Sequence, residues 1–187
     1  MKKLGLLLVP AFLVLASKGL GRNKSTVANS SNRSGRRNVL GNSISLPRGI
    51  RNNNPGNVKK THTNWVGKIN HQVNDDGTFE QFCDMVYGIR AMIRILRTYW
   101  FKYGLTSVEG IIHRWAPMGE NTSQEVQHYI DHVKKRTILF PFLYWEREPI
   151  KALVMAMAEV ENGIKNPFTE EQFNRAWSLL DAKSANC

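Results

Sequence analysis

The sequence predicts a mainly α-helical fold of the α+β type, in which helices carry the core and one small β-hairpin is added. Apolar residues recur every three to four positions in several segments, which is the helical period. Helix-start and helix-stop signals bracket these segments. With 187 residues, 42% of them hydrophobic and 10% aromatic, the chain suits one domain plus a tail and excludes a wholly disordered protein.

Five segments carry these helix signals. Residues 88–101 combine an apolar face with an arginine-rich face. Two later segments open with capping boxes, and another ends in an Asn-Gly pair that is typical of a left-handed cap. The predicted helices are residues 88–101, a helix from the box of Thr106 and Glu109 to Trp115, a helix opened by the box of Thr122 and Glu125, residues 149–161 beginning at Pro149 and stopped at Asn162-Gly163, and a last helix capped by Thr169.

Residues 57–82 are less regular and are the predicted site of the hairpin. Trp65, Val66, Ile69 and Val73 supply apolar positions, and Asp75-Asp76-Gly77 supplies a turn.

The net charge of +11 is divided unevenly along the chain. The first acidic residue is Asp75, so residues 1–74 hold 13 Lys and Arg and no acid, whereas residues 75–187 hold 13 Lys and Arg against 15 acids. A uniformly basic globule that coats nucleic acid is therefore excluded, and we expect no nucleic acid as a partner.

The front of the chain predicts a targeting segment and a linker ahead of the folded domain. Residues 1–19 contain Lys2 and Lys3, then an apolar run of 13 residues, 4–16, which indicates either a cleaved signal peptide or a membrane anchor. A bilayer span needs about 20 residues, so the length favours a signal. Residues 20–47 are predicted to be a basic disordered linker, either a solvated tether or a segment drawn to anionic surfaces. Residues 48–183 are the predicted catalytic domain.

Glu161 is the most informative candidate for chemistry. It falls in the middle of the apolar stripe formed by Ile150, Val154 and Met157, whereas Glu159 falls on the opposite side. A carboxylate in a desolvated setting at the negative end of a helix has a raised pKa and suits a general acid. The alternative is that the helix ends there and Glu161 turns into solvent or pairs with an arginine.

Other carboxylates are weaker candidates. Glu120 is the second choice for the catalytic acid, although its place near a helix start also explains it structurally. A partner carboxylate for a two-acid hydrolysis is offered by Asp75, Asp76, Glu80 and Asp84, whose simpler interpretation is turn and helix-surface charge.

Amides and aromatics supply candidate substrate-binding residues. Asparagine amides suit the N-acetyl and hydroxyl groups of amino sugars, but they also hold turns. Aromatic rings stack on sugars, but are more often buried in a core. The candidates are Asn52, Asn53, Asn54, Asn57, Trp65, Trp115, Tyr129 and Asn162.

Cysteines and histidines predict no metal centre. One disulfide between Cys83 and Cys187 is allowed but not required. His128 and His132 stand four apart without the glutamate of a zinc-protease pattern between them. We expect no metal and no cofactor, and we expect the protein to act as a monomer.

Several motifs resemble a known family. Glu161-Asn162-Gly163, with Asn166-Pro167 soon after, is similar to the catalytic segment of soluble lytic transglycosylases and goose-type lysozymes, although the spacing before Asn166 is longer. Residues 88–91 and 111–133 resemble the helices that follow that segment in the family, yet here they precede it. The resemblance implies a lysozyme-like fold that is circularly permuted, which is feasible where chain ends lie close together.

Residues 48–177 also resemble a narrower group of small phage and prophage proteins. The segment at 48–57, Arg-Gly-Ile-Arg-Asn-Asn-Asn-Pro-Gly-Asn, is its strongest signature. This group includes the wall-lytic enzyme of enveloped double-stranded RNA bacteriophages. The resemblance implies cleavage of the β-1,4 bond between N-acetylmuramic acid and N-acetylglucosamine in peptidoglycan, with Glu161 as acid and then base, by a protein that is exported, membrane-anchored or virion-associated.

Three functions remain open from the sequence. The first is this wall-cleaving enzyme, whose partner is the glycan strand. The second is a non-catalytic virion or wall-binding protein that keeps the fold. The third is a basic membrane- or nucleic-acid-binding protein, which only the tail supports.

Overall fold

The computed structural model describes residues 46–117, 119–138, 144–185 and 187. Six helices lie in these ranges, so the predicted mainly α class is confirmed. They are α1 (Arg48–Arg51), α2 (Met85–Tyr103), α3 (Val108–Trp115), α4 (Ser123–Arg136), α5 (Arg147–Asn162) and α6 (Glu170–Ser178). The targeting segment predicted at 1–19 and the linker up to residue 45 lie outside the described residues. No helix of the described ranges is both long and apolar enough to cross a bilayer.

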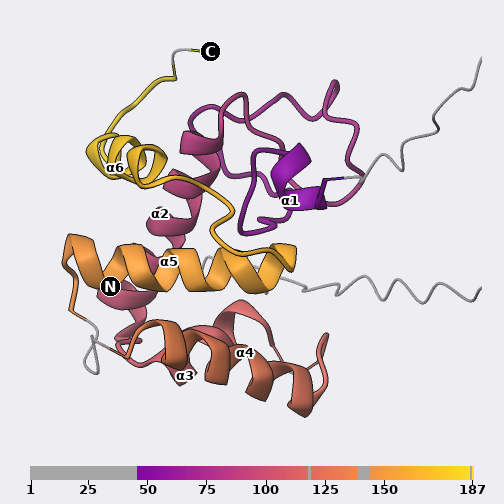
Figure 1. Cartoon of the computed structure of the whole chain (residues 1–187). Coiled ribbons are helices and arrows are strands. Elements are labelled where there is room, and N and C mark those ends of the chain that lie inside the picture. The colour runs from indigo at the N-terminus through magenta and orange to yellow at the C-terminus, as the bar shows by residue number, and fades with distance from the viewer. Residues whose placement is uncertain (1–45, 118, 139–143, 186) are drawn as a thin grey trace, which may run out of the picture.

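Helix α5 occupies the centre of the domain. It packs against α4 on one side and against α1 and α2 on others, while α2 also packs against α6 and α3 against α4. Figure 1 shows α5 crossing the middle, with α3 and α4 together on one side and α1 and α6 on the other. The apolar stripe of α5 explains this position, because Leu153, Val154 and Met157 are completely buried.

Most helix ends follow local sequence signals. The capping boxes of Thr122 with Glu125 and of Thr169 with Gln172 form, and α5 ends on Gly163 in the left-handed conformation with φ of 64°.

Three predicted helix starts are wrong by one to three residues. Helix α2 begins at Met85 rather than at residue 88, after the Asp84 side chain caps it. Helix α3 is capped by Ser107 rather than Thr106, since the Ser107 hydroxyl accepts from the amide of Gly110. Helix α5 begins at Arg147, before Pro149, because proline is tolerated throughout a first turn, where its missing N–H has no partner to lose.

The predicted hairpin does not form a ladder. Among the described residues, the loop before α2 holds two isolated antiparallel bridges, Lys59 with Phe79 and Lys68 with Phe82. Asparagine side chains take the place of strand partners here. The amide of Asn54 donates to the carbonyls of Val58 and Glu80 at 2.9 and 2.8 Å.

The C-terminal tail is tied to the start of α2 in two ways. Cys83 and Cys187 form a disulfide with a Cα–Cα distance of 5.9 Å. The buried Arg90 donates from Nε to the carbonyl of Leu179 at 2.7 Å and from one terminal nitrogen to that of Ala182 at 2.8 Å. Its guanidinium therefore holds backbone carbonyls of the segment that follows α6.

Gly88 lets the 48–57 loop lie directly on α2. A Cβ atom at Gly88 would stand 2.0 Å from the carbonyl oxygen of Asn53 and 2.9 Å from the Pro55 ring. We expect Gly88→Ala to lower the free energy of unfolding by about 1–3 kcal/mol, as overpacking does. Chemical denaturation measures the change. Gly77→Ala is the matched control, because a Cβ there meets nothing within 4 Å. Equal stability of the two variants would contradict this packing argument.

Candidate active site

The carboxylate of Glu161 is held by three side-chain donors at the end of α5. The indole Nε1 of Trp115 donates to Oε1 at 2.8 Å, and the hydroxyl of Tyr129 donates to the same oxygen at 3.0 Å. The amide of Asn57 donates to Oε2 at 3.1 Å. No arginine or lysine of the described residues pairs with it, so these neutral donors orient the carboxylate.

Each donor comes from a different element. Trp115 ends α3, Tyr129 lies in the middle of α4, and Asn57 lies in the loop after α1. Trp115 and Tyr129 are only 0% and 3% exposed, so packing against the core fixes the orientation in which their rings donate to Glu161. Asn57 adopts a positive φ of 46°, which asparagine tolerates better than most residues. Its amide also donates to the backbone carbonyl of Glu161 at 3.0 Å and so fastens the loop to the helix end.

Burial raises the pKa of Glu161 to about 7, because a charged carboxylate loses its hydration there. The hydrogen bonds from Trp115, Asn57 and Tyr129 act in the opposite direction and favour the charged form. Desolvation is the larger effect. The result is a carboxyl group that exchanges a proton near neutral pH, which is the property required of a group that serves as acid and then as base. The carboxylate is thus desolvated, as its place in the apolar stripe predicts, although Glu161 as a whole residue is half-buried.

A groove of about 450 Å³ opens between α4 and the end of α5, and Glu161 itself is not among the residues that line it. Tyr129 borders both the groove and Glu161, and the lining residues Val160 and Gly163 flank Glu161 and Asn162 in the sequence. Glu161 itself keeps partial solvent contact although its carboxylate is desolvated by its neighbours. The groove is lined by Ala116, Asn121, Glu125, Val126, His128, Tyr129, His132, Glu159, Val160, Gly163, Ile164 and Lys165.

Glu159, two residues before Glu161, is a second carboxylate with a structural role, and it is bound by His132 and Arg136. It is 5% exposed although the helical period places it opposite the apolar stripe, because α4 covers that side of α5. Arg136 donates to it from two nitrogens at 3.0 and 2.9 Å, and His132 lies 2.9 Å away. Despite burial, which alone would raise it, hydrogen bonds from the Asn166 amide, His132 and Arg136 hold the pKa of Glu159 below its usual value.

Three predicted sugar-binding amides have structural partners instead. The amide nitrogen of Asn52 donates to Asp76 at 2.8 Å, that of Asn53 to the carbonyl of Phe82 at 3.0 Å, and that of Asn54 to Val58 and Glu80. The structure therefore supports the turn-holding alternative for these three residues.

Asn162 is buried and ties the end of α5 to the loop after α1. Its amide donates to the carbonyls of Pro55 at 2.7 Å and Ala158 at 2.8 Å. Gly49 leaves the room for this contact, since a Cβ there would stand 2.4 Å from the Asn162 amide oxygen.

The predicted stacking aromatics are buried as well. Complete burial prevents Trp115 from stacking on a sugar, and its role here is to hold Glu161. Tyr129 is almost as buried, while Trp65 is half-buried against the core.

Other candidate acids have structural contacts of their own. Glu120 is exposed and pairs with Lys59 at 3.2 Å. Asp76 accepts from the backbone amides of Thr78 and Phe79, and Asp84 caps α2. The buried Glu80 pairs with His71 at 2.8 Å, and Asp75 accepts from the Gln81 amide.

Sequence reasoning missed the holding role of Asn57, Trp115 and Tyr129 and the burial of Glu159. Asn57 and Glu161 are 104 positions apart, and no periodicity within one segment reports such a contact. The spacing of His132 and Arg136, four residues apart on α4, was the one available hint that a carboxylate faces that helix.

Comparison with known proteins identifies a relative. The chain is 43% identical to Protein P5 of Pseudoalteromonas phage PM2 over 133 residues, which cover 70% of this chain and 79% of that protein. The chain belongs to the family of this phage protein. The predicted membership of a phage group is confirmed at this level. No family model matches the chain.

Trp115 controls the proton affinity of Glu161 in this P5 family member. We expect Trp115→Phe to raise the Glu161 pKa from about 7 to about 8 or higher, since a hydrogen bond to a charged group contributes roughly 1.5–3 kcal/mol. A ¹³C NMR titration of the glutamate carboxyl groups measures it. Trp177→Phe is the matched control, because Trp177 stacks on Trp145 and Phe173 instead. An unchanged or lowered pKa in Trp115→Phe would contradict the prediction.

Proposed function

We propose that the chain cleaves the β-1,4 bond between N-acetylmuramic acid and N-acetylglucosamine in bacterial peptidoglycan, as a lytic transglycosylase or muramidase. The observation that carries this proposal is Glu161. Its carboxyl has a pKa of about 7, three neutral donors orient it, and one of these donors, Tyr129, also lines a groove of about 450 Å³.

Glu161 performs both proton transfers in the proposed reaction. In its protonated form it donates its proton to the bridging oxygen as the bond from that oxygen to the muramyl C1 breaks. The resulting carboxylate then removes the proton from the muramyl 6-hydroxyl, whose oxygen attacks C1. This closes a 1,6-anhydro ring and returns Glu161 to its protonated state, so no water is consumed.

The three donors fit this cycle. Trp115, Tyr129 and Asn57 stabilise the carboxylate that exists between the two transfers, whereas burial stabilises the protonated group that begins and ends the cycle. With a pKa of about 7, Glu161 populates both its protonated and its charged form near neutral pH.

A single carboxylate is sufficient for the anhydro-forming route. Retaining and inverting glycosidases need two carboxylates about 5–9.5 Å apart. In the described part of the chain, Asp75, Asp76, Glu80, Asp84 and Glu120 all have other structural contacts. This favours the route in which the substrate supplies its own nucleophile over water-mediated hydrolysis.

The proposal includes a circularly permuted lysozyme-like fold. Its support is the joint between the end of α5 and the loop after α1. Asn57 donates to the Glu161 carbonyl and Asn162 donates to the Pro55 carbonyl, so the loop after α1 is fastened to the end of the Glu161 helix. Glycan strands are the proposed occupants of the groove, with Asn121, His128 and Lys165 available on its walls.

The phage relationship suggests when such an activity is used. A phage meets the peptidoglycan of its host when it infects and again when its progeny leave, and we propose that the enzyme serves one or both steps, either exported or carried in the virion.

Digestion of purified sacculi tests the proposal. We expect soluble muropeptides whose muramyl ends are lighter by one water than those released by a hydrolase, as read by mass spectrometry. If the released muropeptides have ordinary reducing ends, the reaction is hydrolysis rather than anhydro-ring formation. Intact sacculi with a folded protein would reject the enzyme and favour a non-catalytic wall-binding or virion protein.

A further inference from the structure

Aromatic side chains gather at the end of the domain where α2 stops and α5 begins. The ring of Trp145 lies 6.1 Å from that of Trp100, 5.5 Å from that of Phe101 and 6.2 Å from that of Trp177, measured between centroids. We call this set, with Tyr144, the aromatic end. It contains three of the five tryptophans of the chain.

The aromatic end is open to solvent at its edge. Phe101 is 64% exposed and Tyr144 is 59% exposed, while Trp100, Trp145 and Trp177 are half-buried. Single exposed apolar residues are ordinary, but contiguous aromatic groups that keep such exposure mark an interaction surface. Tryptophan and tyrosine are the residues that favour the boundary between lipid headgroups and acyl chains.

A cationic groove adjoins the aromatic end. It has a volume of about 630 Å³ and shares Phe101 as part of its lining. Arg94, Arg97 and Lys102 face it, and Asp181 is its one lining acid. Asp181 lies 3.0 Å from Arg97 and 3.6 Å from Arg94, so three positive charges meet one negative charge.

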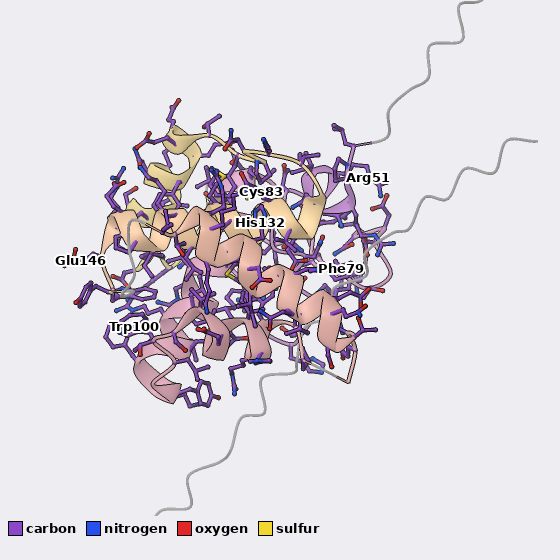
Figure 2. The ribbon with its side chains drawn as sticks, turned by 60° about the horizontal axis from the view of Figure 1, so that its bottom comes forward. Arg51, Phe79, Cys83, Trp100, His132 and Glu146 are labelled. Carbon is purple, nitrogen blue, oxygen red and sulfur yellow. A yellow bond between two sulfur atoms is a disulfide. The ribbon has the colours of Figure 1, made fainter. Side chains whose placement is uncertain are left out.

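This surface lies away from Glu161. Residues 147 and 161 are at opposite ends of α5, about 21 Å apart at 1.5 Å per residue. Figure 2 shows Trp100 and Glu146 at one end of the domain and Arg51 and Phe79 at the other. A body bound through the aromatic end therefore leaves Glu161 and its groove free.

We propose that the aromatic end and the cationic groove dock on the surface of an anionic phospholipid bilayer. The rings would enter the headgroup boundary, and Arg94, Arg97 and Lys102 would meet lipid phosphates. The same chain brings a second signal of this kind, because residues 1–45 hold eight Lys and Arg, no acid, and the apolar run 4–16. A second copy is a poorer occupant, since a two-fold interface here would bring two cationic grooves together.

Docking gives the domain an orientation. When the aromatic end contacts the bilayer, the opposite end of the domain, with Glu161, points away from the membrane surface. The inference does not depend on the proposed wall-cleaving activity, because lipid binding is measured without substrate.

Tryptophan fluorescence of the full-length chain tests the docking. The probe is a phosphatidylglycerol-containing vesicle with brominated acyl chains, which quench only nearby tryptophans. Residues 1–45 contain no tryptophan, so quenching reports on the folded domain rather than on the tail. We expect quenching on these vesicles and much less on vesicles of phosphatidylcholine alone.

Variants assign the effect to the surface. We expect Phe101→Asp to weaken quenching-detected binding about tenfold and Lys102→Gln about fivefold. The matched controls are Val73→Asp, which changes another exposed apolar residue at 71% exposure, and Arg51→Gln, which removes an exposed cation at the far end. Both controls should bind as the unaltered chain does.

Three results would overturn the proposal. Binding without quenching would show that the tail alone holds the vesicle. Equal loss in Val73→Asp or Arg51→Gln would remove the specificity of the aromatic end. A dimer in vesicle-free solution that Phe101→Asp dissociates would make a second copy the occupant.

Discussion

Glu161→Gln is expected to reduce the release of muropeptides from sacculi by roughly 10³-fold, because it removes the group that serves as both acid and base in the proposed reaction. The amide has nearly the same shape, so the loss would be chemical rather than structural. Quantifying soluble muropeptides over time measures it.

Two further variants give this result its meaning. Glu148→Gln is the matched control, since it alters an exposed glutamate in the first turn of the same helix and should leave lysis intact. Glu120→Gln examines the other acid proposed from the sequence, and its exposed ion pair with Lys59 predicts that lysis continues. If lysis survives Glu161→Gln but is lost in Glu120→Gln, the catalytic acid is Glu120 and not Glu161.

The same substitution should alter the pH dependence of stability. The folded state raises the pKa of Glu161 from an ordinary 4.5 to about 7. The contribution of protonated Glu161 to the free energy of unfolding is therefore fully present below pH 4.5. It is lost as the pH rises from 4.5 towards 7. The loss is about 3 kcal/mol, at 1.36 kcal/mol for each pKa unit. Denaturation at several pH values should show this loss in the unaltered chain and not in Glu161→Gln. Parallel curves for the two proteins would mean that Glu161 is not desolvated.

Loss of the disulfide between Cys83 and Cys187 should have the largest effect on stability. The bond closes a loop with a sequence separation of 104, and constraining an unfolded loop of that length is worth about 4.7 kcal/mol. The bond also connects the residue before the α2 cap to the C-terminal tail that Arg90 holds. We expect reduction to lower the free energy of unfolding by about 4–5 kcal/mol, so the domain would be most stable in an oxidising compartment.

Urea denaturation with and without a reductant measures this effect. The double variant Cys83→Ser with Cys187→Ser should match the reduced protein and should not respond to reductant. A difference below about 1 kcal/mol between oxidised and reduced protein would show that the unfolded chain gains little freedom from opening the loop.

Local signals explain how much of the fold could be predicted. The helix ends at Thr122, Thr169 and Gly163 were identified because a cap depends on residues within one turn of it. The hairpin was mispredicted for the opposite reason. Its apolar positions and its turn signal are present, but the amides of Asn54 and Asn74 bind backbone groups that a second strand would have used.

The candidate site divides in the same way. Desolvation of the Glu161 carboxylate follows from its place in the apolar stripe of one helix, which a single segment reveals. Burial of Glu159 does not, since it depends on α4 covering the other side of α5 and bringing Arg136 to meet the charge. The asparagine-rich segment 52–57 predicts sugar binding, whereas the amides of Asn52, Asn53 and Asn54 hold the loop itself.

By itself the sequence determined the helical class, the division between a basic N-terminal part and a nearly neutral domain, and Glu161 as the acid candidate. These properties depend on composition or on neighbours within one helix. Only the tertiary structure decided that Trp115, Tyr129 and Asn57 hold the carboxylate, that Cys83 joins Cys187, and that aromatic and cationic side chains share one end. Such contacts join residues as many as 104 positions apart, and they arise from packing between elements, which no local pattern encodes.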